Sequence, residues 1–143
     1  MNIPQKLKNH IRSVTIPVQF RRTEHHLILV ASHAYWKERL LNAIWNKETL
    51  DIHEIMKDDS CDLGHWLRSG EAHPHIIHLQ SYNDLISKNV EFHIQASKVA
   101  KYINARDYSA ALRLTEYKSA FEYSSTAVIS AIFCLKKEAI KLH

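Results

Sequence analysis

The segment LILVASHAYWKERLLNAIW, residues 27–45, decides the fold class of this 143-residue chain. When the residues are projected at about 100° per residue, apolar and polar side chains separate onto two halves of the wheel. The apolar half holds Leu27, Leu29, Val30, Ala34, Trp36, Leu40, Leu41, Ile44 and Trp45, and the polar half holds Ser32, Tyr35, Glu38, Arg39 and Asn42. This separation predicts an amphipathic α-helix that begins near Thr23, a suitable N-cap.

The same periodicity continues along the chain. It predicts a short helix over residues 61–68, a long helix over residues 75–104 with Pro74 in its first turn, and a final long helix after a break at residues 105–107. The inward positions of the two long helices recur every three or four residues: Leu79, Leu85, Ile86, Phe92, Ala96, Val99, Ala100 and Ile103, then Ala111, Leu114, Phe121, Ser125, Val128, Ile132, Leu135, Ala139 and Leu142. We therefore expect an all-α, antiparallel four-helix-bundle-like fold with a short helix that carries Cys61.

The composition and charge of the chain further restrict its fold class, its division into segments and its location in the cell. Only 2 Gly and 3 Pro argue against an all-β fold, and 45% hydrophobic residues suffice for one core, which we assign to residues 23–143. Residues 1–22 are basic and contain Pro17, so we expect an extended or irregular leader. No apolar run approaches the roughly 20 residues of a membrane span, and no signal peptide is evident. We expect a cytoplasmic protein with no membrane insertion and no nucleic-acid partner.

Two histidines fall on apolar helix faces. His33 lies between Leu40 and Ile44 on its wheel, and His93 lies on the buried stripe of the third helix, one turn after Asn89. A buried imidazole or amide without a partner costs about 1–3 kcal/mol. These side chains should therefore satisfy one another, either through a shared metal ion or through a hydrogen-bond network.

The presence of Cys61 favours a shared metal ion over a hydrogen-bond network. A thiolate with imidazoles is a soft, mixed ligand set that suits tetrahedral Zn²⁺. His33, Cys61 and His93 come from three predicted helices, so a shared ion would couple metal binding to folding. The second cysteine, Cys134, is interpreted as a small packing residue. We expect no enzyme activity, because the nearest acid on the third helix, Glu91, falls on the polar side.

Three segments resemble the chemoreceptor zinc-binding (CZB) domain family. They are His33-Ala-Tyr-Trp36-Lys37, Cys61-Asp-Leu-Gly64-His-Trp66-Leu and Asn89-Val-Glu-Phe92-His93, and the resemblance spans roughly residues 23–140. It implies a helical sensory module of bacterial signalling proteins, of the chemoreceptor or diguanylate cyclase class, that pairs as a homodimer. It also implies a Zn²⁺ site of three histidines and one cysteine, in which His33, Cys61 and His93 take the first, second and fourth places.

The third place departs from the family, because Asn89 stands where the family has histidine. Three outcomes follow for the site: three protein ligands plus water, Asn89 or another histidine as the fourth ligand, or loss of the metal. The leading hypothesis is a sensor of zinc, of oxidation at Cys61, or of both. The alternative is a metal-free dimerisation module with a vestigial site.

Overall fold

The computed structural model describes residues 21–58, 61–68 and 76–141. These residues form helices joined by turns, with no strand among them, and the predicted all-α class is confirmed. The helices are α2 (Arg21–Trp45), α3 (Ile52–Met56), α4 (Asp62–Arg68), α5 (Gln80–Asn104), α6 (Tyr108–Leu114) and α7 (Ala120–Ile140). None of the helices in this part of the chain combines the length and apolar character that crossing a bilayer requires.

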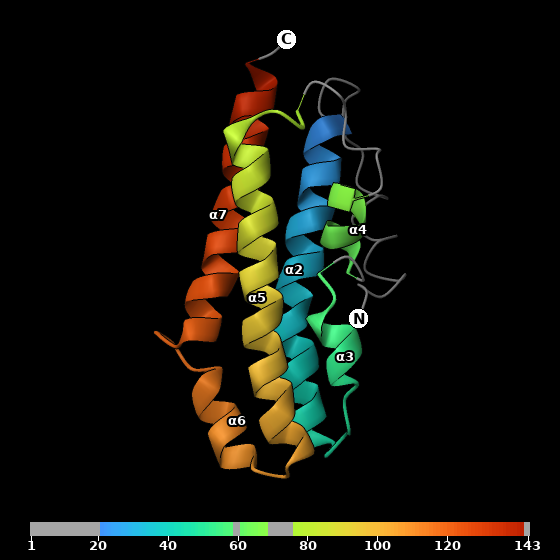
Figure 1. Cartoon of the computed structure of the whole chain (residues 1–143), viewed down its shortest axis with the longest axis vertical. Helices are drawn as coiled ribbons and strands as arrows, with labels where there is room; N and C mark the ends of the chain where they lie inside the picture. Colours follow the sequence, from blue (N-terminus) through green and yellow to red (C-terminus); the bar gives the residue numbers. More distant parts are fainter. Residues whose placement is uncertain (1–20, 59–60, 69–75, 142–143) are drawn as a thin grey trace.

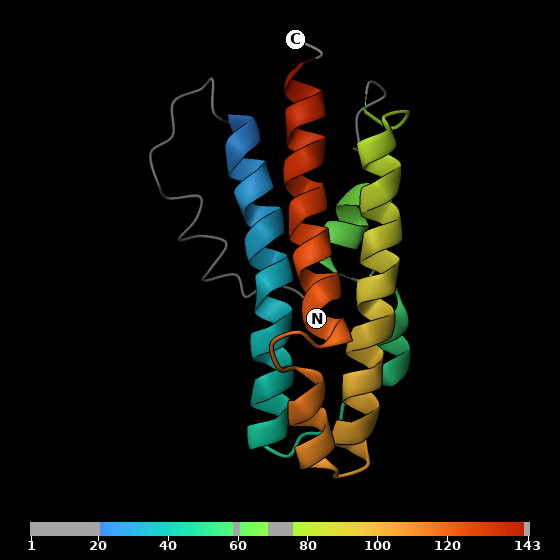
Figure 2. The same ribbon diagram turned by 90° about the vertical axis from the view of Figure 1, so that its left-hand side faces the viewer.

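The helices form a bundle of four columns (Figures 1 and 2). In Figure 1, α2 and α5 run downward, whereas α3 followed by α4, and α6 followed by α7, run upward. Helix α5 packs along α7 and against α3, and α2 packs against α7 and α4. Two columns are therefore continuous long helices, and the other two are each divided into two helices.

The division between α6 and α7 corrects the prediction of one long final helix. Asp107 caps the start of α6 by accepting a hydrogen bond from the Ala110 N–H, and Ser119 caps the start of α7 in the same way from Glu122. Lys118, just before the second cap, has a left-handed φ of 70°. Ser119 and Glu122 have the spacing of a capping box, a local signal that the hydrophobic periodicity alone does not register.

Other helix boundaries also differ from the prediction. Thr23 lies inside α2, so it is not the N-cap. Helix α5 starts at Gln80, because residues 76–78 form a turn; Pro74 and residue 75 lie outside the described residues. Helix α3, which no prediction placed, is capped by Asp51. The predicted leader lies outside the described residues except for its last two, which belong to α2.

Among the side chains that the structure describes, the core follows the predicted apolar faces with three exceptions; the predicted positions Leu27, Leu29 and Leu142 lie outside the described side chains. Trp36, Leu40 and Ile44 on α2 are buried, as are Leu85, Phe92, Ala96, Val99, Ala100 and Ile103 on α5 and Phe121, Val128, Ile132 and Leu135 on α7. Ala34 and Trp45, however, are exposed on α2. Cys134 is also exposed, so the prediction that it packs inside is wrong. Its position on the α7 wheel is beyond the edge of the buried stripe.

Candidate metal centre

The candidate site lies where the column formed by α3 and α4 is divided. Carbonyl groups at the end of a helix have no partner within the helix and must find one elsewhere. Here α5 supplies a partner for one carbonyl in the last turn of α3 and for another in the turn that follows it. His93 Nδ1 donates to the Ile55 carbonyl over 2.8 Å, and Asn89 Nδ2 donates to the Asp58 carbonyl over 2.9 Å. The division of the column therefore brings backbone acceptors to two polar side chains on one face of α5.

Cys61 sits immediately before α4, where it acts as the N-cap. Its Sγ accepts a hydrogen bond from the Gly64 N–H over 3.2 Å, as the oxygen of a capping Ser or Asp would. The same sulfur lies 3.2 Å from His93 Nε2 and 3.8 Å from the Asp58 carbonyl oxygen. The thiol is buried in the core. Local capping of α4 thus holds the sulfur beside the imidazole.

The hydrogen bonds of His93 determine which ring nitrogen carries the proton. A carbonyl oxygen can only accept, so Nδ1 must be the protonated nitrogen that faces Ile55. In the neutral ring, Nε2 then has its lone pair directed toward Cys61 Sγ. A ring that donates through one nitrogen to a backbone carbonyl is the usual arrangement of a metal-binding histidine, because the outer hydrogen bond orients it.

Asn89 has a side-chain oxygen, Oδ1, whose surroundings in the site are unusual. Asn89 lies one helical turn before His93 on the same face of α5, with 1% of its surface exposed. Its Nδ2 group is bonded to Asp58, but its Oδ1 is buried and has no hydrogen-bond partner in the part of the chain that the structure describes. A buried acceptor left without a donor or a cation costs about 1–3 kcal/mol. This oxygen is therefore a place where a water molecule or a metal ion would stabilise the fold.

His33 reaches the same core from α2 but is turned toward α7. Its Nε2 lies 3.1 Å from both the carbonyl oxygen and the Oγ of Ser125, and its ring centroid lies 4.2 Å from that of Phe92. Burial lowers the pKa of His33 from 6.5 to about 4; the hydrogen bond to the Ser125 carbonyl opposes this shift, and the charge of His93 adds to it. His33 is consequently neutral near pH 7.

The structure thus brings Cys61, His93 and Asn89 together and directs His33 to a separate partner. Among the residues it describes, no three His, Cys, Asp or Glu side chains lie close enough to hold one metal ion. Trp36 contributes to the packing of the site, because its ring contacts that of His93 with centroids 5.1 Å apart.

Sequence reasoning missed the backbone groups of the site. The carbonyls of Ile55 and Asp58 and the N–H of Gly64 carry no sequence signature, because every residue has them. Ser125 was placed on the inward face of α7, but its pairing with His33 was not foreseen. Only the Cys61-x-x-Gly64 spacing, which matches an N-cap contact, could have suggested one of these interactions.

The donor set fits part of a zinc site. Tetrahedral Zn²⁺ with one thiolate and one imidazole would separate the sulfur and nitrogen by roughly 3.5 Å, close to the 3.2 Å found between Cys61 Sγ and His93 Nε2. Asn89 Oδ1 supplies a further oxygen that none of the described residues satisfies. Two zinc-type donors and an unsatisfied oxygen are therefore present in one buried place.

Comparisons with known proteins add no assignment. No protein-family model matches this chain, and neither a curated protein nor a solved structure matches it.

Proposed function

We propose that this chain is a zinc-binding sensory or regulatory domain that responds to zinc, to oxidation of Cys61, or to both. The observation that carries the proposal is the buried pair of Cys61 and His93, 3.2 Å apart, beside the unpartnered Oδ1 of Asn89. The resemblance of the His33, Cys61 and His93 segments to the CZB domain supports the same function.

Cys61 and His93 would hold the ion, and Asn89 would contribute its Oδ1 or hold a bound water. His33 is the remaining candidate, and it would have to exchange its bonds to Ser125 for the site. Bound Zn²⁺ would keep the Cys61 sulfur as a thiolate and would join α4 to α5. The Ile55 carbonyl fixes the orientation of the His93 ring, and Gly64 stabilises the sulfur through its N–H.

Oxidation would act on the same sulfur atom. A peroxide or hypochlorous acid transfers an oxygen atom to the thiolate, which becomes a sulfenic acid while the oxidant is reduced to water or chloride. The oxidised sulfur is a poorer ligand, and its added oxygen needs space between Asp58 and His93. Zinc and oxidants would therefore compete for Cys61, and both would change how the α3–α4 column packs on α5.

The second candidate function is a metal-free interaction module. Its supporting observation is that His33 and the Nδ2 group of Asn89 already have protein partners. In either case we propose a cytoplasmic, non-enzymatic protein that forms a homodimer and acts on a bacterial signalling protein of the chemoreceptor or diguanylate cyclase class, without binding nucleic acid or inserting into a membrane.

Metal analysis of the protein purified without added zinc tests the proposal. We expect about one equivalent of zinc in the wild-type protein and in Cys134→Ser, the control at the exposed cysteine, and a loss of the metal in Cys61→Ser. Chelation should also lower the melting temperature of the wild-type protein but not that of Cys61→Ser. Less than roughly a tenth of an equivalent in the wild-type protein, with no effect of chelator, would favour the metal-free module.

A further inference from the structure

The sulfur of Cys61 is enclosed by the bundle. Cys61 is 2% exposed, and its Sγ lies 3.2 Å from His93 Nε2 on one side and accepts the Gly64 N–H over 3.2 Å on another. An ion or an oxidant of the kind proposed above has to touch this atom. Part of the structure around Cys61 must therefore open locally before either of them can reach the sulfur.

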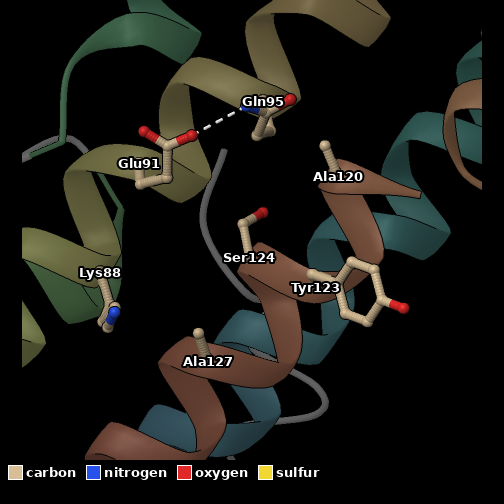
Figure 3. Close-up of a pocket in the computed structure, with 7 residues that line it drawn as sticks. All are labelled: Lys88, Glu91, Gln95, Ala120, Tyr123, Ser124 and Ala127. Carbon is tan, nitrogen blue, oxygen red and sulfur yellow. Dashed lines mark hydrogen bonds between the residues drawn. The ribbon is translucent and has the colours of Figure 1, made fainter. Parts of the chain in front are cut away.

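The hollow between α5 and α7 does not supply the route (Figure 3). Its volume is about 340 Å³, and Lys88, Glu91 and Gln95 line it on the α5 side. With 3.6 residues per turn, these three positions lie roughly 140° or more around the axis of α5 from His93. The hollow is therefore on a different side of α5 from the one that faces Cys61, and access has to come through the divided α3–α4 column.

Asp58 connects this column to its neighbours through both its backbone and its side chain. Its carbonyl oxygen accepts the hydrogen bond of Asn89 Nδ2 over 2.9 Å and lies 3.8 Å from Cys61 Sγ. Its carboxylate accepts a hydrogen bond from Arg68 Nη2 over 2.6 Å. Arg68 is the last residue of α4, so its side chain reaches back to a residue that precedes the helix. The ion pair thus joins a residue before Cys61 to a residue after it.

Helix α4 depends on contacts with the rest of the bundle. At seven residues it is too short to persist alone in water. On its inner side Leu63 and Leu67 are buried, and the Leu67 carbonyl accepts a hydrogen bond from the Tyr82 hydroxyl. The ion pair of Arg68 and Asp58 lies on the outer side, where the two side chains are 47% and 26% exposed. Solvent and salt therefore act on this pair while the inner contacts stay dry.

We propose that the ion pair of Asp58 and Arg68 holds α4 closed over Cys61 and so controls how fast ions and oxidants reach the sulfur. Separation of the pair frees the C-terminal end of α4 from the residue that precedes the helix, and local opening becomes more frequent. An exposed ion pair stabilises a fold only slightly, so its effect is on the rate of access. The inference rests on the proposed function, because it regulates the same site, but it can be tested on metal-free protein.

Thiol labelling of the full chain tests this control of access. The parent protein carries Cys134→Ser, so that Cys61 is its only cysteine, and is treated with chelator first. Dithiodipyridine is the probe, because it is neutral and a change of protein charge does not alter its attraction. The Cys61 thiolate attacks one sulfur of the probe, forms a mixed disulfide and releases a pyridinethiolate, which takes up a proton and is followed by its absorbance. The labelling rate reports the fraction of molecules in which the site is open.

Arg68→Met should raise the labelling rate roughly two- to fivefold, and the increase should disappear at about 1 M salt, where the pair is screened in the parent as well. Lys37→Met is the matched control. It removes the cation of a pair between α2 and α7 whose side chains have similar exposure, 41% and 29%, and it should leave the rate unchanged. Asp58→Asn should give the same increase as Arg68→Met, and the double variant should label no faster than either single variant.

A rate that Arg68→Met leaves unchanged overturns the inference. Equal increases in Arg68→Met and Lys37→Met also overturn it, because they would reflect a general loss of stability. Additive effects of Arg68→Met and Asp58→Asn would show that the two side chains act separately, which contradicts it too. If the predicted rates are found in a chain that binds no zinc, the ion pair does control access to Cys61, and only the proposed zinc site fails.

Discussion

Two helix interfaces of the bundle each contain a buried histidine. They are the interface between α2 and α7, which we call the α2–α7 seam, and the interface of α5 with the α3–α4 column, which we call the α5 seam. The two histidines make different contacts. Between α2 and α7, His33 bonds to the carbonyl and hydroxyl of Ser125. Between α5 and the α3–α4 column, His93 bonds to a backbone carbonyl on one side and contacts the Cys61 sulfur on the other, while neighbouring Asn89 keeps an unpartnered oxygen. The first seam lies where both helices are unbroken, at His33 of α2 and Ser125 of α7, whereas the second lies at the division between α3 and α4.

The difference shows how a division in a helix column can leave backbone carbonyls available to the side chains of a neighbouring helix. Backbone carbonyls that an unbroken helix would satisfy internally are here available to His93 and Asn89. These bonds orient both side chains, which would reduce the entropy lost if an ion binds there as proposed. The α2–α7 seam holds its imidazole in hydrogen bonds to Ser125, whereas in the α5 seam His93 Nε2 faces the Cys61 sulfur.

Asn89→His should have the largest effect on this comparison. The new imidazole would face the same direction as the amide, one turn before His93, and would add a third zinc-type donor beside Cys61 and His93. We expect zinc affinity to rise on the order of a hundredfold, or about 3 kcal/mol, in competition titrations with a chromophoric chelator.

Gln95→His is the matched control for that variant, because it adds an imidazole to the same helix on its hollow-lining side. It should leave the affinity unchanged. If Asn89→His binds zinc no more tightly than the wild-type protein, the oxygen of Asn89 does not point into a metal site.

Acid should destabilise the α2–α7 seam through His33. Its pKa is about 4 in the folded protein and near 6.5 in the unfolded chain, so the unfolded chain binds the extra proton between these values. The free energy of unfolding should therefore decrease as the pH falls from 6.5 to 4, by about 3 kcal/mol for this group.

His33→Gln removes the titration and keeps a donor for the Ser125 carbonyl. Chemical denaturation of this variant at several pH values should give a flatter profile than the wild-type protein over that interval. His78→Gln, at an exposed histidine, should follow the wild-type curve. Parallel profiles for His33→Gln and wild type would show that burial of this imidazole does not control acid stability.

The two histidine sites also show which structural features could be predicted from the sequence. Hydrophobic periodicity identified the bundle and placed His33, His93 and Asn89 on buried faces, because a side chain's position on a helix follows from its number in the chain. The partners of these side chains were not predictable in the same way. Ser125 is 92 residues from His33, and Ile55 and Asp58 contribute only backbone atoms.

Cys134 shows a second limit of the pattern. It lies one position before buried Leu135, and a wheel cannot give the width of the surface that a neighbouring helix covers. The missed boundary at Ser119 has a different cause. Capping is a short-range interaction, and here it interrupts a longer hydrophobic repeat that continues on both sides of the turn.

Tyr82→Phe should lower the free energy of unfolding through the α5 seam, by less than the effects expected at Asn89 and His33. The Tyr82 hydroxyl donates to the Leu67 carbonyl and so holds the end of α4 against α5. Removing it leaves a buried carbonyl without that donor, and we expect a loss of about 1 kcal/mol in the free energy of unfolding by urea denaturation. Tyr102→Phe, at an exposed hydroxyl, should cause no change. Equal stability of the two variants would mean that water replaces the lost donor.

The smallest effect should come from the ion pair of the α2–α7 seam. Lys37 donates to Glu122 over 3.0 Å, but both side chains are partly exposed, so solvent and salt weaken their attraction. Glu122 also lies in the first turn of α7, where its charge interacts with the helix dipole. A double-mutant cycle of Lys37→Met and Glu122→Gln separates the two contributions and should give a coupling energy of about 0.5 kcal/mol that decreases in high salt. A coupling energy as large as the pH effect of His33 would instead mean that the outer ion pair, and not the buried imidazole, holds α2 against α7.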